Sequence, residues 1–522
     1  MNKKAIIVKF FTTFLFLLFL LIISTISIFT QSNKNQITTI TTNGEIIRYL
    51  KANLYGGETE EILTVYKNVI SKKICLAIFS LEKSKIQKIF DIELDSSYFF
   101  FSTANLNGST LSILLFTENS VSIVNLFESS YKIEKYLSFK KAAFGYNFSN
   151  DFPYINTAYD INNDKIDELF ILTTNSIEIY ENKQLIQSYP YQVQAYYNYK
   201  SSFGGLSSSQ NILMIFPDIL LEDINNDGYK DLILKYRTKI EYSFFDINSK
   251  QFSKGKILDL SKYISVRSGY SFFNEHIKII NFDNDKYPDI LIFNFNMASV
   301  FNSDKTGILT YLFKGNKEGW FSSPSNQFFI EELSGIESKM TFNDFNKDGL
   351  TDLINIGSKL FSTNFLLSLS MKRSIPVYIS FYPQINDSFS KTPITQIEKS
   401  ISLDNQNVLD SSQLSFDFYS TFDLASIISE VVVNYENDFN SDSIKDYVFY
   451  NFDGTFSLFL SNISNQTIFQ KKENASIFVS NDFLTVYYLS GPYTLIIRDN
   501  KIFYLINIIK RQGKIYITLI NF

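Results

Sequence analysis

The chain has 522 residues, which allows one large repeat domain or two to four ordinary domains. Apolar residues make up 45% of it and charged residues 19%, so a substantial core is possible, and the many aromatic residues favour strands. A net charge of −5 without a long basic run argues against nucleic-acid binding, and a single cysteine excludes an intrachain disulfide framework.

The first thirty residues predict an export segment. Three lysines precede an uncharged run from Phe10 to Thr30. This order is typical of a signal peptide, and the run is also close to the roughly 20 residues that span a bilayer. We expect residues 1–30 to be either a cleaved signal peptide or an uncleaved N-terminal hydrophobic anchor helix. Both alternatives place the remainder of the chain, secreted or membrane-anchored, outside the cytoplasm.

Two stretches come next that are degenerate copies of a loop rich in Asp and Asn, which recurs later in the chain. The stretch "NLYGGETEEILTV" begins at Asn53 and "NLNGSTLSILLF" begins at Asn105. Both keep small residues and a strand-like run but have lost most carboxylates, so we expect neither to bind a metal ion. Between them, Cys75 in "KKICLAIF" is expected to be a small buried apolar group.

The full acidic loop occurs five times. Each copy has an acid or amide at loop positions 1 and 3, Asp at position 5, often Gly at position 6 and an acid at position 9, and an apolar run follows. The copies begin 63, 58, 63 and 94 residues apart, and the long last interval predicts an insertion at about 372–409. We call them the first to fifth acidic loops: 160–168, 223–231, 281–289, 344–352 and 438–446.

Alternating oxygen side chains on a tight turn form a cage that suits a hard cation such as calcium. In the second loop, "DINNDGYKD", we assign Asp223, Asn225, Asp227 and Asp231 as side-chain ligands, with the backbone carbonyl of Tyr229. A divalent ion would offset the repulsion among the three carboxylates. The alternative is a set of solvated Asp/Asn turns without metal.

Position 6 should need positive φ, which glycine adopts at little cost. Gly228 suits it, whereas Lys165, Lys286 and Ser443 occupy it in the first, third and fifth loops, which should therefore bind more weakly. EF-hand and dockerin interpretations fail, because strand-like runs flank each loop and no copy has the acid that an EF-hand needs at position 12.

Repeat intervals of 52 to 63 residues, apart from the last interval of 94, consist nearly entirely of strand-like sequence and predict an all-β fold. Seven units fit a seven-bladed β-propeller of four-stranded antiparallel blades over residues 31–522. A parallel β-helix is the rival, but its calcium repeats are much shorter.

The stretches "DINNDGYKDLIL" and "DFNKDGLTDLI" resemble the FG-GAP/VCBS repeats of integrin alpha propellers and of many exported proteins. Faint FG pairs lie at Phe144–Gly145 and Phe203–Gly204, and the resemblance covers roughly residues 45–470. In that family, calcium loops join the first two strands of a blade, on the face opposite the usual ligand surface. The resemblance implies up to five calcium ions, bound by Asp160, Asn162, Asp164, Glu168, Asp223, Asn225, Asp227, Asp231, Asn281, Asp283, Asp285, Asp289, Asp344, Asn346, Asp348, Asp352, Asp438, Asn440, Asp442 and Asp446.

The resemblance implies a calcium-stabilised adhesion module that binds a protein or glycan. From the charge pattern and the N-terminal apolar run, we expect no nucleic-acid partner and membrane contact only through the N-terminal segment. Candidate binding stretches are Tyr189–Gly205 and the insertion, although an edge strand with ordinary packing explains them equally well. Two alternatives stay open: a polysaccharide-degrading enzyme and a structural component of a surface assembly. The single histidine, His276, is expected to be structural, and paired carboxylates are the only catalytic arrangement left open.

Overall fold

The computed structural model describes most of the chain between residues 38 and 520, and every regular element in the described parts is a strand. The expected signal or anchor helix lies outside them, as do His276 and both FG pairs. Among the residues that were described, we find no apolar helix with the length that a membrane crossing needs. The described ranges are 38–56, 60–82, 85–143, 152–201, 208–264, 277–294, 307–331, 339–346, 348–357, 374–402, 435–438, 446–450, 455–461, 469–471, 477–478, 493–499, 502–509 and 514–520.

The first four sheets are antiparallel and four-stranded, and each is built from successive segments of the chain. The first sheet is β2 (Gly44–Ala52), β3 (Glu61–Asn68), β4 (Ile74–Glu82) and β5 (Lys85–Glu93). The second is β6 (Phe100–Asn105), β7 (Leu111–Phe116), β8 (Ser120–Leu126) and β9 (Tyr131–Ser138). The third is β10 (Ala158–Tyr159), β11 (Glu168–Leu172), β12 (Ser176–Glu181) and β13 (Gln184–Pro190). The fourth is β16 (Asp218–Glu222), β17 (Asp231–Lys235), β18 (Lys239–Ser243) and β21 (Lys256–Asp259).

The next three sheets repeat the pattern, and the seventh carries an additional short strand. The fifth sheet is β22 (Ile277–Ile280), β23 (Asp289–Asn294), β24 (Gly307–Phe313) and β27 (Asn326–Glu331). The sixth is β28 (Lys339–Asn343), β29 (Asp352–Gly357), β30 (Ser374–Tyr382) and β33 (Thr395–Ser402). The seventh is β34 (Tyr435–Asn437), β35 (Asp446–Tyr450), β36 (Thr455–Ser461), β37 (Phe469–Lys471) and β38 (Ile477–Phe478).

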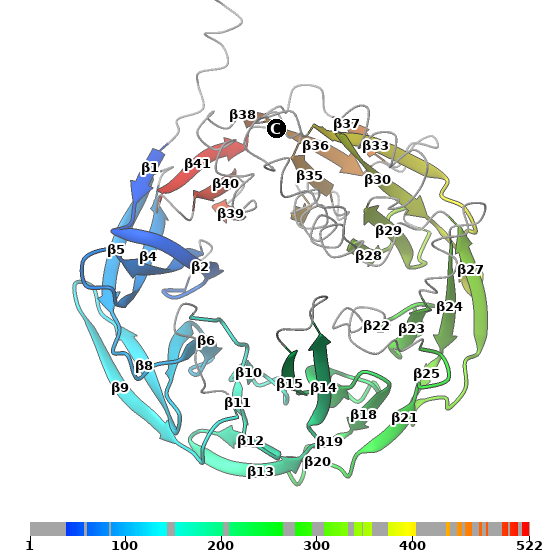
Figure 1. The fold of residues 1–522 in the computed structure, drawn as a ribbon, viewed down its shortest axis with the longest axis horizontal. Coiled ribbons are helices and arrows are strands. Elements are labelled where there is room, and N and C mark those ends of the chain that lie inside the picture. Colours follow the sequence, from blue (N-terminus) through cyan, green and yellow to red (C-terminus); the bar gives the residue numbers. More distant parts are fainter. Residues whose placement is uncertain are drawn as a thin grey trace, which may run out of the picture.

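The eighth sheet joins the two ends of the described chain. Its order is β1–β41–β40–β39, so β1 (Thr38–Thr41) pairs with β41 (Lys514–Ile520) beside β40 (Ile502–Ile509) and β39 (Tyr493–Asp499). Figure 1 shows the sheets arranged in a ring, with β9, β13, β21 and β27 on the outer rim. This ring of antiparallel sheets is a β-propeller.

The expected number of seven blades is not confirmed, because the described residues form eight sheets of four or more strands. The count from sequence relied on acidic loops, and β39, β40 and β41 follow one another without such a loop. An insertion was predicted at about 372–409. Its described residues include β30 and β33, which are strands of the sixth sheet, and the small hairpin between them.

Four two-stranded hairpins supplement the sheets. Three of them lie between the third and fourth strands of a sheet: β19 (Phe245–Asp246) with β20 (Gln251–Phe252), β25 (Gly315–Asn316) with β26 (Gly319–Trp320), and β31 (Gln384–Ile385) with β32 (Ser388–Phe389). The other pairs β14 (Gln194–Ser201) with β15 (Ser208–Ile215) between the third and fourth sheets.

The core lies between neighbouring sheets. Leu63 and Leu76 of the first sheet, for example, pack with Phe101 and Leu115 of the second, and all four are fully buried. Central strands such as β11 are buried along their whole length, because sheets cover both of their faces. Cys75 is buried, as the sequence predicts.

Candidate metal centres

Each acidic loop joins the first and second strands of a sheet, and the residue before position 1 pairs with the acid at position 9. The closing pairs of the first four loops are Tyr159–Glu168, Glu222–Asp231, Ile280–Asp289 and Asn343–Asp352. Asn437 and Asp446 close the fifth loop in the same way, although its residues 439–445, with Asn440 and Asp442, lie outside the described ranges. The loops are therefore equivalent hairpin connections at one end of their sheets.

Backbone amides fix the side-chain oxygens of the second loop. The two carboxylate oxygens of Asp223 accept from the N–H groups of Asp227 (3.1 Å) and Gly228 (2.9 Å). The Oδ1 atom of Asn225 also accepts from Asp227 N–H, at 3.0 Å, and Asp227 Oδ1 accepts from Tyr229 N–H, at 2.9 Å. These bonds hold the oxygens of positions 1, 3 and 5 within one turn.

The fourth loop repeats this geometry. Its Asp344 accepts from Asp348 N–H at 3.2 Å and from Gly349 N–H at 2.9 Å, and Asn346 accepts from Asp348 N–H at 2.9 Å. In the first loop, Asp160 and Asn162 accept from Asp164 N–H at 3.2 and 2.9 Å. Three loops thus share one arrangement of oxygen atoms.

The acid at position 9 is buried in all four described loops. Asp231 accepts from Ile224 N–H at 2.9 Å with one oxygen and from Phe245 N–H at 2.8 Å with the other. Burial, together with the nearby Asp227 and Asp223 carboxylates, raises the pKa of Asp231 to about 7. Burial likewise raises the pKa of Glu168 to about 7, and those of Asp289 and Asp352 to about 6.

Position 6 has the positive φ that the sequence predicts. The angle is 91° at Gly228 and 86° at Gly349, and the lysines Lys165 and Lys286 adopt 71° and 103°. Because side chains rarely occupy this region, the two lysine loops are strained where the glycine loops are not.

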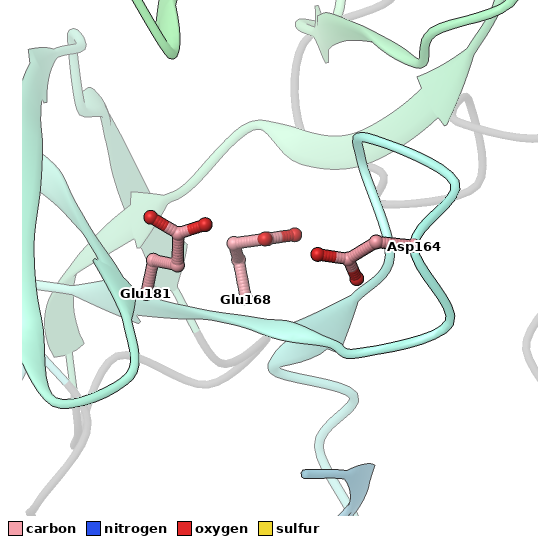
Figure 2. A group of neighbouring side chains, drawn as sticks. All are labelled: Asp164, Glu168 and Glu181. Carbon is pink, nitrogen blue, oxygen red and sulfur yellow. The ribbon is translucent and has the colours of Figure 1, made fainter. Parts of the chain in front are cut away.

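The first loop gains a further carboxylate from the third strand of its sheet. Asp164, Glu168 and Glu181 each place a carboxylate oxygen within 4.8 Å of the others, and Figure 2 shows Glu168 between the other two. Lys250, from the turn between β19 and β20, contacts the Glu181 carboxylate at 2.7 and 3.0 Å. Glu181 was not among the residues predicted from sequence, because only the strand register places it beside the loop.

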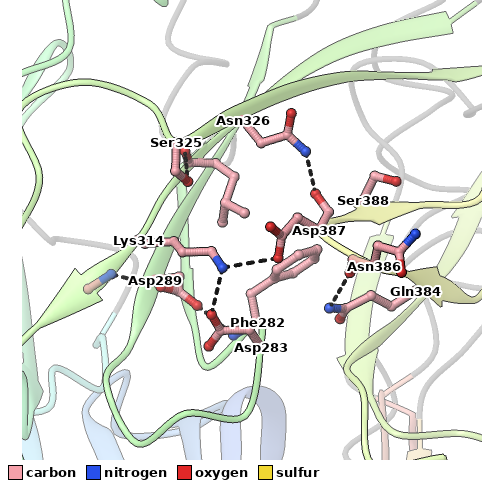
Figure 3. A network of polar contacts seen from close by, with 12 residues as sticks. Phe282, Asp283, Asp289, Lys314, Ser325, Asn326, Gln384, Asn386, Asp387 and Ser388 are labelled. Atoms are coloured by element: carbon pink, nitrogen blue, oxygen red, sulfur yellow. Dashed lines mark hydrogen bonds and ion pairs between the residues drawn. The ribbon is translucent and has the colours of Figure 1, made fainter.

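The third loop differs, because a lysine contacts its position-3 acid. The Lys314 ammonium lies 3.0 Å from Asp283 Oδ2 and 3.0 Å from Asp387 Oδ1 (Figure 3). Asp289 keeps the common position-9 bonds, from Phe282 N–H at 3.0 Å and Gly315 N–H at 2.8 Å. For Asn281 no bond to the other loop side chains is described.

Neighbouring loops also contact one another. Asn163 Nδ2 donates to the carbonyl of Gly228, linking the first loop to the second. Lys230 N–H donates to Ile161 O at 3.0 Å across the same junction. Asn284 Nδ2 donates to Gly349 O at 3.1 Å, linking the third loop to the fourth. The loops therefore join sheets as well as strands.

The degenerate copy at Asn53 keeps one element that the sequence analysis missed. Glu61 stands at its position 9, is buried, and accepts from Leu54 N–H at 2.8 Å. Ala52 pairs with Glu61, which is the closing pair of the full loops. The copy at Asn105 closes differently, with Asn105 opposite Leu111.

The oxygen-rich loops fit a hard divalent cation such as calcium, which prefers carboxylate, amide and carbonyl oxygens. In the first, second and fourth loops, the described residues bring together carboxylates that burial and mutual repulsion would otherwise destabilise. The third loop fits less well, because an ammonium already contacts Asp283.

A cavity of about 270 Å³ lies at the other end of the second, third and fourth sheets. Its lining includes Phe116 and Leu172, the last residues of β7 and β11, and Phe216, which precedes β16. Since the acidic loops lie at the opposite ends of these strands, the cavity and the loops are on opposite faces of the ring.

The candidate stretch Tyr189–Gly205 divides into two parts. Tyr189 and Tyr191 are buried in the core, as expected if this part of the stretch serves packing and binds no ligand. From Gln194 onward the chain leaves the sheets as strand β14, and β15 returns to Phe216 at the cavity. In the view of Figure 1, β14 and β15 lie nearer the centre of the ring than β18 and β21 do.

No family model matches the chain, and a search of curated proteins found no match. Among solved structures, the Dos1 propeller is 10% identical, with 94% of this chain and 95% of that chain covered and a TM-score of 0.38. A structure of BBS1N in complex with ARL6DN, soaked with lead, is 9% identical, with 82% and 94% covered and a TM-score of 0.29. The propeller assignment rests on the ring of sheets, and the resemblance to FG-GAP/VCBS repeats rests on the loop residues.

Proposed function

We propose that this protein is an exported, calcium-stabilised β-propeller that binds a protein or glycan on the face opposite its acidic loops. One observation carries the proposal: the cavity and the β14–β15 hairpin lie at one end of the sheets and the acidic loops at the other. One face thus offers a recess beside the base of a hairpin, while the other carries the loops that link neighbouring sheets.

Calcium would be held by the side chains of loop positions 1, 3, 5 and 9, and its positive charge would offset the clustered carboxylates. Asp223, Asn225 and Asp227 already have their oxygens oriented by backbone amides, so little reorganisation is required. Bonds between neighbouring loops would transmit this rigidity from one sheet to the next. A rigid ring lowers the entropic cost of presenting a binding surface.

Export is supported by the sequence of residues 1–30, with its lysines followed by an apolar run. An exported location also suits calcium loops, because weak calcium sites of extracellular modules have dissociation constants of about 10⁻⁴–10⁻³ M. The same topology applies to a cleaved signal peptide and to a membrane anchor.

The enzyme alternative requires a pair of carboxylates in a recess. The described cavity is lined by one carboxylate, Asp218, whose Oδ2 atom lies 2.9 Å from the Lys235 ammonium. This lining therefore favours binding over glycoside hydrolysis. A structural component of a surface assembly would use the same faces for permanent contacts.

The test is a pull-down of surface proteins and glycans with the purified protein, in calcium and in chelator. Asn156→Trp narrows the cavity, since Asn156 lines it and is exposed. Ser129→Trp is the matched control, because Ser129 is exposed in the β8–β9 turn at the loop end. We expect saturable binding that Asn156→Trp and chelator abolish and Ser129→Trp keeps. Binding that survives Asn156→Trp unchanged would refute the assigned face.

A further inference from the structure

One position of the repeat carries opposite charges in different copies. It is the residue at the end of the third strand, or directly after it, that falls opposite the acid at loop position 9 when the strand register is continued by one residue. The strand registers place Glu181 there in the third sheet and Lys314 there in the fifth. Phe244 and Pro383 occupy it in the fourth and sixth sheets. We call it the facing position.

The loop with a lysine at the facing position also differs from the others at loop position 3, where it has an aspartate in place of an asparagine. In the first, second and fourth loops, position 3 is an asparagine whose amide donates to the position-5 acid, at 3.2, 2.9 and 3.0 Å. The third loop has Asp283 there, which lacks an N–H donor. Lys314 lies 3.0 Å from Asp283 Oδ2, so in this loop an ammonium contacts the carboxylate at position 3 (Figure 3).

The third loop shows a second sign that its acids are arranged around this ammonium. Asp283 Oδ1 is buried and has no hydrogen-bond partner in the described structure, so Lys314 supplies the main compensation for that carboxylate.

The same position takes part in an ion pair with the next sheet, and the charges of that pair are exchanged. Glu181 pairs with Lys250 of the β19–β20 turn, and Lys314 pairs with Asp387 of the β31–β32 turn. Lys250 and Asp387 are equivalent, because each lies two residues before the phenylalanine that ends its hairpin, Phe252 or Phe389. Either arrangement joins two sheets, but the two leave opposite charges beside the loop.

We infer that the facing position decides whether an acidic loop takes calcium: Glu181 adds a carboxylate to the first loop, and Lys314 replaces the ion in the third. This inference rests on the proposed calcium binding of the other loops. A calcium ion in the third loop would have to displace or repel an ammonium that already contacts Asp283. At separations of a few ångströms, such like-charge repulsion lowers affinity by at least about a hundredfold.

The first experiment compares the number of calcium ions bound by the full-length protein, measured by isothermal titration calorimetry. Asp285→Ala in the third loop should leave the number unchanged. Asp227→Ala, the matched change at position 5 of the second loop, should lower it by one. A loss of one ion with Asp285→Ala would overturn the inference.

The second experiment exchanges the charges. Lys314→Glu with Asp387→Lys keeps the ion pair between sheets and gives the third loop the arrangement of the first, so the protein should bind one more ion. Adding Asp285→Ala should remove that gain. The reciprocal pair, Glu181→Lys with Lys250→Asp, should lower the number by one.

Lys314→Met is the substitute if the double variant does not fold. It keeps most of the apolar stem and removes the charge, so it should also bind one more ion than the wild type. Folded charge-exchange and Lys314→Met variants that gain no ion would overturn the inference. A wild-type protein that binds no calcium overturns the proposed function separately, and the gain or absence of an ion in Lys314→Met still decides the role of Lys314.

Discussion

Replacing the buried Asp231 by asparagine should stabilise the protein without calcium and destabilise it with calcium. Burial raises the pKa of this carboxyl from 3.8 to about 7, so its ionised form at pH 8 costs about 4 kcal/mol without a cation. Asparagine removes the charge but offers one acceptor to two backbone donors, Ile224 N–H and Phe245 N–H. The orphaned donor costs about 1–3 kcal/mol, which leaves a net gain of about 1–3 kcal/mol.

In calcium the sign should reverse. A site at a hundredfold excess of calcium over its dissociation constant contributes about 2.7 kcal/mol, which Asp231→Asn forfeits together with the orphaned donor. Thermal melts at pH 8, in chelator and in millimolar calcium, measure both effects. The exposed Glu128→Gln is the control and should change neither melt. Equal destabilisation by Asp231→Asn in both conditions would refute the reasoning, because the charge would then not matter.

Three further outcomes are expected. In chelator, the melting temperature should fall as pH rises from about 4 to about 7, because acids with raised folded-state pKa values stabilise the fold while protonated and lose that contribution on ionisation. Calcium should reduce the trend to the part that comes from the third loop, and a pH-independent melt in chelator would contradict the reasoning. The acids concerned are Glu168, Asp231, Asp289 and Asp352. Lys165→Gly should relieve about 1 kcal/mol of backbone strain and tighten calcium binding in calorimetry, whereas Lys183→Gly, at a similar φ outside the loops, should leave the affinity unchanged. Deleting Thr38–Thr41 should lower the melting temperature, because β41 loses its only partner besides β40 among the described strands, and a synthetic peptide of these residues should restore it in trans; an unchanged melt would show that this pairing is dispensable.

Much of the loop geometry was predictable from residue types. The oxygen side chains at alternate positions, the strand that follows each loop and the positive φ at position 6 all follow from local chemistry. The structure has each of them, including the left-handed lysines Lys165 and Lys286. Glu61 was also readable, since it lies eight residues after Asn53, as the full loops require.

Features that depend on strand pairing were not predictable. Glu181, the last residue of β12, and Lys314, which directly follows β24, are placed beside their loops by strand pairing, and their sequence distance from the position-9 acid differs between copies. The eighth sheet escaped the repeat count because it carries no acidic loop and draws one strand from the other end of the described chain. The stretch around 372–409 was predicted to be an insertion, because only strand pairing shows that β30 and β33 belong to the sixth sheet.

The composition of the eighth sheet imposes an order of events on biosynthesis. Its outer strand, Thr38–Thr41, is made early, whereas its partners end at Ile520. Every earlier blade can form while the ribosome is still working, but the circle stays an open arc until β39, β40 and β41 emerge. Prematurely terminated chains therefore keep an unpaired strand edge at each end of the arc, by which chaperones and proteases can distinguish them from the finished ring.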